Sequence, residues 1–349
     1  MSTNSFQQWP AEQLESVDSC PVCGSTKRKN LESGLVDWMS NPSTGPWEMK
    51  NCLQCRVAFL SPRPLPESIS FAYAHYYTHT SAKDDLVDSR LRQFRNFFAE
   101  KYYKAAFGSK GLLENGIYLL LRILVPFSSY LDSKSRHLFQ LVQKPGRLLD
   151  VGCGNGEFLK FARNHGWDVT GIDFDEKAIT EAGSSGLDVR LGSIEVIDSE
   201  EKFDFICLSH VIEHVYDPAE FVRSCYSRLN DGGVLWLETP NIEGFGNSIY
   251  KSNWRGLEPP RHLILFNREA ISELSLKMGF VSVKQKLHGL SGLYMGLSSE
   301  RLLNNTSPCG SLVSCITRKL AMLLRVSFLE LAQMFSKRRR EFLTIIAVK

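Results

Sequence analysis

Four cysteines near the start of the sequence have the spacing of metal ligands. Cys20 and Cys23 form one C-x2-C pair, and Cys52 and Cys55 form a second pair after 28 intervening residues. Two tight turns with two thiolates each complete the tetrahedral sulfur set that a structural Zn2+ prefers. Because protein sulfurs would fill every ligand position, we expect a structural rather than a catalytic zinc ion. The alternative is two pairs of free or disulfide-linked cysteines.

A glycine-rich turn in the middle of the chain has the character of a ligand-binding loop. Gly152, Gly154 and Gly156 lie between an expected strand and an expected helix, where glycine lets the backbone approach a ligand closely. The G-x-G-x-G spacing differs from the G-x-G-x-x-G of dinucleotide-binding folds. Asp150 would repel a pyrophosphate, but a carboxylate suits the ammonium and sulfonium groups of S-adenosylmethionine (SAM).

Two residues at the end of the next expected strand fit the same ligand. Asp173 closes the stretch GWDVTGID, and a carboxylate there can accept two hydrogen bonds from ribose hydroxyls. Phe174 follows and is placed to pack on an adenine ring. We therefore predict SAM as the cofactor rather than a nicotinamide dinucleotide.

The motif H-x-x-E-H follows a later expected strand, with His210, Glu213 and His214 at its defined positions. On another fold this motif would indicate a metalloprotease, but the preceding strand and the glycine loop argue against that interpretation. A histidine at this strand end can take a proton from a hydroxyl or an acidic carbon as a methyl group transfers. The alternative is that Glu213 and His214 only brace the loop.

A second candidate base lies in the segment PPRHLILF. His262 either accepts the proton itself or anchors the substrate pocket together with Arg261. Methyl transfer from a sulfonium is an in-line displacement, so alignment matters more than strong acid–base help.

These residues need a fold that brings the ends of several strands together. Apolar runs alternate with helical patterns from about residue 147 onward, which predicts a doubly wound α/β sheet. The expected helices are 157–165, 217–229 and 267–278. The expected strands are 147–151, 168–172, 187–191, 203–208, 234–238, 280–287 and 341–348.

The chain divides into five expected parts. They are a zinc-binding module (1–62), a helical lid or linker (63–143), a SAM-binding core (144–289), an amphipathic helical insertion (290–340) and a final core strand (341–349).

The glycine loop and the later motifs resemble the class I SAM-dependent methyltransferases over about residues 140–290 and the final strand. The stretches 203–218 and 232–241 resemble the fourth and fifth strands of that family. The resemblance implies a Rossmann-like seven-stranded sheet. It implies cofactor contacts from Ser209, and adenine contacts from Ser193 and Ile194, although the usual Asp of that loop is absent.

The N-terminal cysteine pairs and the segment PPRHLILF are typical of one branch of this family, which includes nucleotide-sugar C-methyltransferases and cell-surface glycan methyltransferases. By resemblance to the sugar enzymes, their Glu–His pair corresponds to Glu213 and His214, which makes His214 the candidate base. Ubiquinone-type relatives have a glutamate at the position of His210, where it contributes to a metal site, so this sequence departs from them there.

Two further segments have two interpretations each. Tyr73, His75, Tyr76 and Tyr77 form either a lid over a sugar or aromatic acceptor, or ordinary helix packing. The amphipathic stretch 312–335 leads into a basic run at 337–340. It either lies on an anionic membrane surface, which would suit a lipid-linked glycan acceptor, or caps the active site.

The composition sets the remaining limits. A net charge of +3 gives little support to a nucleic-acid partner, and 43% hydrophobic residues are typical of a globular protein. We find no signal-peptide pattern at the N-terminus and expect a cytoplasmic protein, with the inner membrane face as the alternative.

We predict a SAM-dependent methyltransferase acting on a small molecule, foremost a nucleotide-linked or glycan sugar. The alternatives are a quinone- or phenol-type O-methyltransferase, an RNA methyltransferase and a non-catalytic SAM- or zinc-binding protein.

Overall fold

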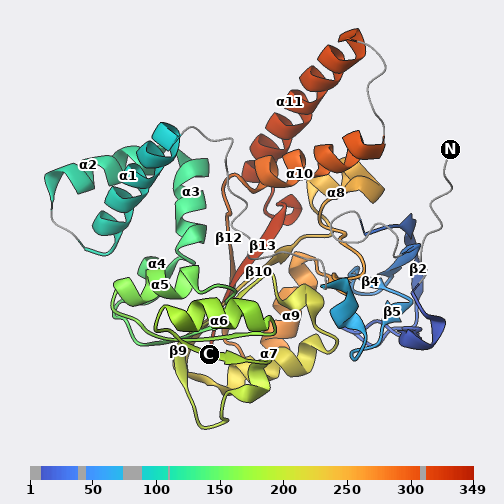
Figure 1. The fold of residues 1–349 in the computed structure, drawn as a ribbon, viewed down its shortest axis with the longest axis horizontal. Helices are drawn as coiled ribbons and strands as arrows, with labels where there is room; N and C mark the ends of the chain where they lie inside the picture. Colours follow the sequence, from blue (N-terminus) through green and yellow to red (C-terminus); the bar gives the residue numbers. More distant parts are fainter. Residues whose placement is uncertain (1–8, 38–44, 74–88, 109–110, 307–311) are drawn as a thin grey trace.

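The computed structural model describes residues 9–37, 45–73, 89–108, 111–306 and 312–349 (Figure 1). The predicted α/β fold with a seven-stranded sheet is confirmed, and the strand order is β12-β13-β10-β9-β6-β7-β8. Strand β13 runs antiparallel to both of its neighbours, whereas the other strand pairs are parallel. The strands are β6 (Arg147–Val151), β7 (Asp168–Asp173), β8 (Asp188–Leu191), β9 (Phe203–Ser209), β10 (Leu229–Pro240), β12 (Ser282–Lys286) and β13 (Phe342–Val348).

Alternating apolar residues bury both faces of this sheet. In β6, Leu148 packs in a cluster with Leu159 of α5, whereas Leu149 joins a cluster that includes Phe221 and Ile271 on the opposite face. Successive strand residues point to opposite faces, so helices must cover both sides. Helices α5 (Glu157–Asn164) and α6 (Glu176–Ser184) cover one face, and α7 (Pro218–Ser227) and α9 (Arg268–Lys277) cover the other.

Short polar side chains begin three of these helices. Asp175 accepts hydrogen bonds from the first amides of α6, and Asn267 accepts one from Ala270 in α9. The predicted start of α7 at Asp217-Pro218 is confirmed, because the Asp217 carboxylate accepts from two amides of the first turn. These caps satisfy amides that have no partner within the helix.

The N-terminal module (residues 1–62) is joined to the core through a shared sheet with the order β11-β4-β3-β2. Its strands are β2 (Arg28–Leu35), β3 (Trp47–Cys52), β4 (Ala58–Leu60) and the distant β11 (Ile264–Leu265). A two-stranded sheet of β1 (Leu14–Glu15) and β5 (Arg63–Pro64) completes it. The Leu60 amide donates to the Leu263 carbonyl at 2.9 Å, and the Leu263 amide donates to the Glu213 carbonyl at 2.8 Å. The module therefore supports the backbone of the H-x-x-E-H motif.

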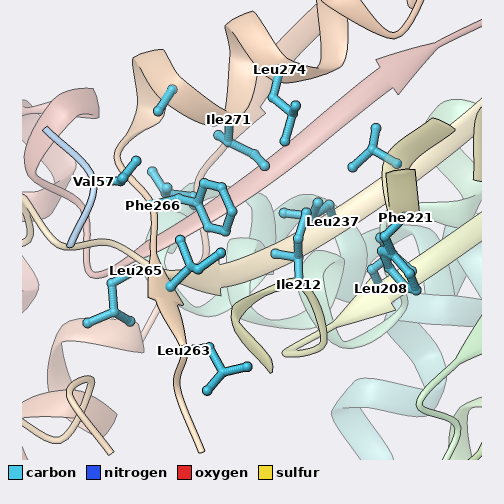
Figure 2. Close-up of a cluster of buried hydrophobic side chains, with 14 of the residues drawn as sticks. Val57, Leu208, Ile212, Phe221, Leu237, Leu263, Leu265, Phe266, Ile271 and Leu274 are labelled. Carbon is cyan, nitrogen blue, oxygen red and sulfur yellow. The ribbon is translucent and has the colours of Figure 1, made fainter. Parts of the chain in front are cut away.

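Side chains from these separate segments also share one core. Figure 2 shows Val57 of the N-terminal module, Ile212 of the motif, Leu263 and Ile271 of α9 gathered in one hydrophobic cluster. Val57, Ile212 and Ile271 are fully buried, and Leu263 is nearly so. Close packing of this kind fixes the motif loop against both the sheet and the module.

Two helical groups project from the sheet (Figure 1). One contains α1 (Ser89–Ala106), α2 (Leu112–Ile123), α3 (Val125–Lys134) and α4 (Leu138–Leu141). The other contains α8 (Phe245–Tyr250), α10 (Ser291–Thr306) and α11 (Leu312–Phe335). No single helix among the described residues has the length and hydropathy of a membrane span. Only α2 and α3 taken together meet that test, and they are bent by 114°.

Candidate functional site

The four cysteines of the N-terminal module converge as their spacing predicts. The sulfurs of Cys20 and Cys55 are 3.5 Å apart, as are those of Cys23 and Cys52, and all four lie within 4.8 Å of one another. Sulfurs about 2.3 Å from a tetrahedral zinc ion lie about 3.8 Å apart. The four thiolates therefore fit a structural zinc ion.

Two matching turns hold these sulfurs in place. The Gly24 amide donates to the Cys20 carbonyl at 2.8 Å, and the Arg56 amide donates to the Cys52 carbonyl at 3.0 Å. Gly24 has φ 73° and Arg56 has φ 63°, so both turns end in the left-handed region. Because Asn267 donates to the Cys55 carbonyl at 2.7 Å, the second turn is tied directly to the start of α9.

The glycine loop lies at the carboxyl end of β6, where ligands bind in open α/β sheets. Gly152, Gly154 and Gly156 have φ values of 72°, 54° and 77°, which side chains rarely tolerate. The Gly154 amide donates to Asp173 Oδ2 at 2.8 Å, and the Asp175 amide donates to Asp173 Oδ1 at 2.9 Å. Asp173 thus fixes the loop and the start of α6. Each of its oxygens keeps a second lone pair for a ligand hydroxyl.

Asp150 differs from its expected role as a partner for the charges of SAM. Its carboxylate is fully buried and forms an ion pair with Arg136, while Cys207 Sγ donates to it at 3.0 Å. Burial raises the pKa of Asp150, and the nearby Arg136 opposes that shift. The Arg136 guanidinium in turn stacks 3.7 Å from the ring centre of Phe158. Strand β6 directs the Asp150 side chain toward α5 rather than toward the glycine loop. Arg136 therefore balances the Asp150 carboxylate from inside the fold.

The other predicted cofactor residues differ in exposure. The Phe174 ring is 76% exposed beside the glycine loop, as an adenine platform requires. Ser193 is half-buried, and Ser209 ends β9 opposite Glu238 of β10. The Ile194 side chain is fully buried in the hydrophobic core, so a side-chain contact with adenine is not available in this structure. Its place at the start of a 3-10 turn (Ile194–Val196) directs it inward.

The two candidate bases lie side by side and next to Glu213. His214 Nδ1 donates to the Arg261 carbonyl at 2.9 Å, and His262 Nδ1 donates to the Gly256 carbonyl at 2.7 Å. Since carbonyls only accept, both protons lie on Nδ1, and each neutral ring presents a bare Nε2. The two ring centres are 5.0 Å apart. The structure thus brings together Glu213, His214 and His262, with one ligand atom of each within 4.8 Å of the others.

Burial controls the charge states in this cluster. It lowers the pKa of His214 and lowers that of His262 well below the usual range. Burial opposes ionisation of Glu213, but the hydrogen bond from His210 and the three nearby histidines outweigh it and lower the pKa to about 2. Glu213 Oε2 is buried and has no hydrogen-bond partner among the described residues. An ionised carboxylate with an unsatisfied oxygen and two imidazole nitrogens could hold a divalent cation.

A second polar cluster was not recognised from the sequence. Glu238, on the strand next to β9, accepts from His288 Nδ1 at 2.7 Å and from Thr344 Oγ1 at 2.6 Å. His210 Nε2 lies 3.7 Å from the same carboxylate. Burial lowers the pKa of His210, but the hydrogen bond and charge of Glu213, together with Glu238, raise it overall. The available signal was a single acidic residue in the apolar strand segment VLWLE.

Arg261 lies in the wall of this site rather than facing a pocket. It is 1% exposed, and two of its nitrogens donate to the two oxygens of Asp37, at 2.6 and 2.8 Å. Its Nε donates to Glu258 at 2.9 Å, and it also donates to the Ala72 carbonyl at 3.1 Å. Arg261 therefore links the N-terminal module to the carbonyl that orients His214.

The predicted aromatic lid is described only in part. Tyr73 Oη lies 3.2 Å from His214 Nδ1, which places this residue at the candidate site. His75, Tyr76 and Tyr77 lie outside the described residues.

Two basic residues of the N-terminal module have acidic neighbours. Arg28 pairs with Asp18 and Lys50 pairs with Glu48, around a polar hollow far from the glycine loop in sequence. Paired surface cations give little support for binding a phosphate backbone. The absence of a nucleic-acid partner stays a prediction.

The geometry agrees with a comparison against protein families. Residues 127–285 match the family model described as "Methyltransferase domain". This part of the chain is a methyltransferase domain. The methyltransferase domain contains the glycine loop, Asp173, the H-x-x-E-H motif and His262, whereas the four cysteines and α11 lie outside it.

Curated relatives match a little over a quarter of the chain. The ubiquinone biosynthesis O-methyltransferase of Caulobacter vibrioides is 40% identical over 102 residues, which cover 27% of this chain and 40% of that protein. The protein of the same name from Coxiella burnetii is 31% identical over 109 residues, covering 29% and 47%. The chain thus spans less than half the length of these relatives. A crystal structure of a SAM dependent methyltransferase from Archaeoglobus fulgidus is 21% identical, with a TM-score of 0.43, over 66% of this chain and 99% of that one.

Proposed function

We propose that the protein transfers a methyl group from SAM to a small-molecule acceptor, foremost a nucleotide-linked or glycan sugar. The observation that carries this proposal is the glycine loop fixed by Asp173 at the carboxyl edge of a methyltransferase-domain sheet. Candidate proton acceptors lie at the end of β9, on the same edge of the sheet. In the proposed reaction, the acceptor atom attacks the methyl carbon, the bond from that carbon to sulfur breaks, and a histidine Nε2 takes the acceptor proton.

Cofactor binding gives the first test. Calorimetry should show SAM binding by the full-length protein, and Asp173→Ala should weaken it by about 10- to 100-fold, because a charged hydrogen-bonding group to the ribose and to Gly154 is lost. Asp168→Ala is the matched control, since Asp168 begins the same strand and is exposed. Equal affinities of the two variants would contradict the role of Asp173. Absence of SAM binding by the unmodified protein would overturn the proposed function.

A phenolic acceptor is the second candidate, and two observations favour it. The matching relatives carry the name ubiquinone biosynthesis O-methyltransferase. The Glu213–His214–His262 cluster also has the donors of a two-histidine, one-carboxylate cation site. The neighbouring His210, outside this cluster, stands where ubiquinone-type proteins have a metal-site glutamate. A divalent cation held in the cluster would polarise an acceptor oxygen as a Lewis acid.

Metal analysis separates the two proposed sites. After dialysis against a chelator, we expect about one zinc per chain to remain on the four cysteines, because a closed thiolate site holds zinc tightly. Titration with Mn2+, followed by electron paramagnetic resonance, should then reveal a second site that Glu213→Gln removes while zinc content stays unchanged. Absence of Mn2+ binding would remove the cation proposal and leave the histidines as bases. A zinc content below about half per chain would count against the cysteine site.

A further inference from the structure

Helix α11 carries an apolar face that is largely exposed, with Phe328 at its edge in contact with the Phe245 ring of α8. We call this the outer face, and its side chains are 50–87% exposed. Its members are Ile316, Leu320, Leu323, Leu324, Phe328, Leu331 and Phe335. The spacing of three and four residues keeps them on one side of the helix over roughly 28 Å.

The opposite face of α11 is packed against α10, which holds the helix in place. Val326, Leu329 and Gln333 are buried against α10 and its neighbours. Gly292 and Gly296 of α10 allow close approach, because a Cβ at Gly292 would lie 2.7 Å from the α11 backbone. The structure therefore fixes one face of α11 against α10, and Figure 1 shows the helix projecting away from the sheet.

Charge is concentrated around the same helix. Residues 312–340 contain seven basic residues and one acidic residue, a net charge of +6, whereas the whole chain carries +3. The rest of the chain is therefore negative. Within this segment, Arg325 and Arg338 pair with Glu300 and Glu243, and the Arg340 side chain is buried.

These observations favour an anionic lipid surface over a second copy of the chain. Two copies of α11 would bring like charges together, whereas anionic headgroups attract them. Helix α2 also has exposed leucines, but its charged residues Glu114 and Arg122 are balanced by Lys101 and Asp132. We propose that the outer face of α11 docks the protein on an anionic membrane surface, with its apolar side chains in the headgroup boundary.

Vesicle co-sedimentation of the full-length protein tests this proposal. Vesicles of phosphatidylcholine mixed with phosphatidylglycerol should bind about tenfold or more tightly than vesicles of phosphatidylcholine alone, and salt should weaken the binding. The double variant Leu324→Glu/Phe328→Glu should lose binding by about tenfold or more. Both positions are at least half exposed, so the fold should tolerate them.

A matched control uses exposed apolar residues elsewhere. Leu276→Glu/Val281→Glu changes the charge equally at side chains that are 51% and 76% exposed, near the end of α9. This control should bind vesicles as the unmodified protein does. Equal loss in both double variants, or no vesicle binding by the unmodified protein, would overturn the proposal. A dimer in light scattering that only Leu324→Glu/Phe328→Glu dissociates, without vesicle binding, would instead identify an interface between copies.

Discussion

Replacement of Arg261 by methionine is expected to lower the free energy of unfolding by about 3–5 kcal/mol. The substitution leaves the Asp37 carboxylate, which is 1% exposed, without the two hydrogen bonds from the Arg261 guanidinium. Glu258 loses one partner but keeps its ion pair with Arg255. The main cost is therefore the loss of the bidentate guanidinium partner of the buried Asp37 carboxylate.

Urea unfolding followed by tryptophan fluorescence measures this effect, because Trp47 of the module and Trp254 of the adjoining loop are both buried. The double variant Arg261→Met/Asp37→Leu should recover most of the loss, since no buried carboxylate then lacks its guanidinium partner. Arg338→Met is the control. Arg338 pairs with Glu243 at the surface, and its removal should leave the midpoint unchanged. A single Arg261→Met variant as stable as the unmodified protein would show that the pair is not stabilising.

The same pair explains why the N-terminal module matters to the candidate site. Asp37 follows the last strand residue Leu35 of β2, and Arg261 presents the carbonyl that accepts from His214. The sequence separation of Asp37 and Arg261 is 224 residues, so no local pattern could have joined them. Long-range ion pairs of this kind depend on how the module packs against the loop.

Local patterns did predict the parts of the fold that local physics controls. Short apolar runs located the strands because both sheet faces are covered. Asp217-Pro218 marked a helix start because the first amides need an acceptor. The cysteine spacing predicted the four-sulfur cluster because each C-x2-C pair occupies one tight turn. The three glycines predicted the ligand-binding loop because its backbone is left-handed at each of them.

The side chains whose surroundings were not evident from the sequence depend on tertiary neighbours. Asp150 was expected to face the cofactor, but Arg136, from the loop between two helices, supplies its counter-charge. Ile194 was expected near adenine, but a tight turn directs it into the core. Glu238 was overlooked because its partners His288 and Thr344 come from two other parts of the sheet. Strand periodicity predicts on which face of the sheet a side chain lies, but not which residue packs against it on that face.

Replacement of His214 by alanine is expected to lower turnover by about 10²- to 10⁴-fold while leaving SAM affinity unchanged. The Arg261 carbonyl holds the proton of His214 on Nδ1, so Nε2 is ready to accept a proton or a cation. Asp173 ends β7 and the glycine loop follows β6, so the hydrogen bonds between them do not involve His214. The measurement is formation of S-adenosylhomocysteine with an acceptor from a panel of nucleotide sugars and dihydroxyphenols, with SAM affinity from calorimetry.

His165→Ala is a matched control for this variant, because His165 Nδ1 also bonds to a backbone carbonyl, that of Phe161 at 2.8 Å. It lies at the end of α5, away from the carboxyl edge of the sheet, and its removal should leave turnover unchanged.

The variant His262→Ala then distinguishes the two possible roles of His214, as a base or as a cation ligand. If the cluster binds a cation, turnover and Mn2+ binding should fall together in both histidine variants. If His214 is the base, its loss alone should abolish most turnover and leave the SAM affinity intact. Near-native turnover of His214→Ala would exclude both roles, because each requires the imidazole nitrogen at the end of β9.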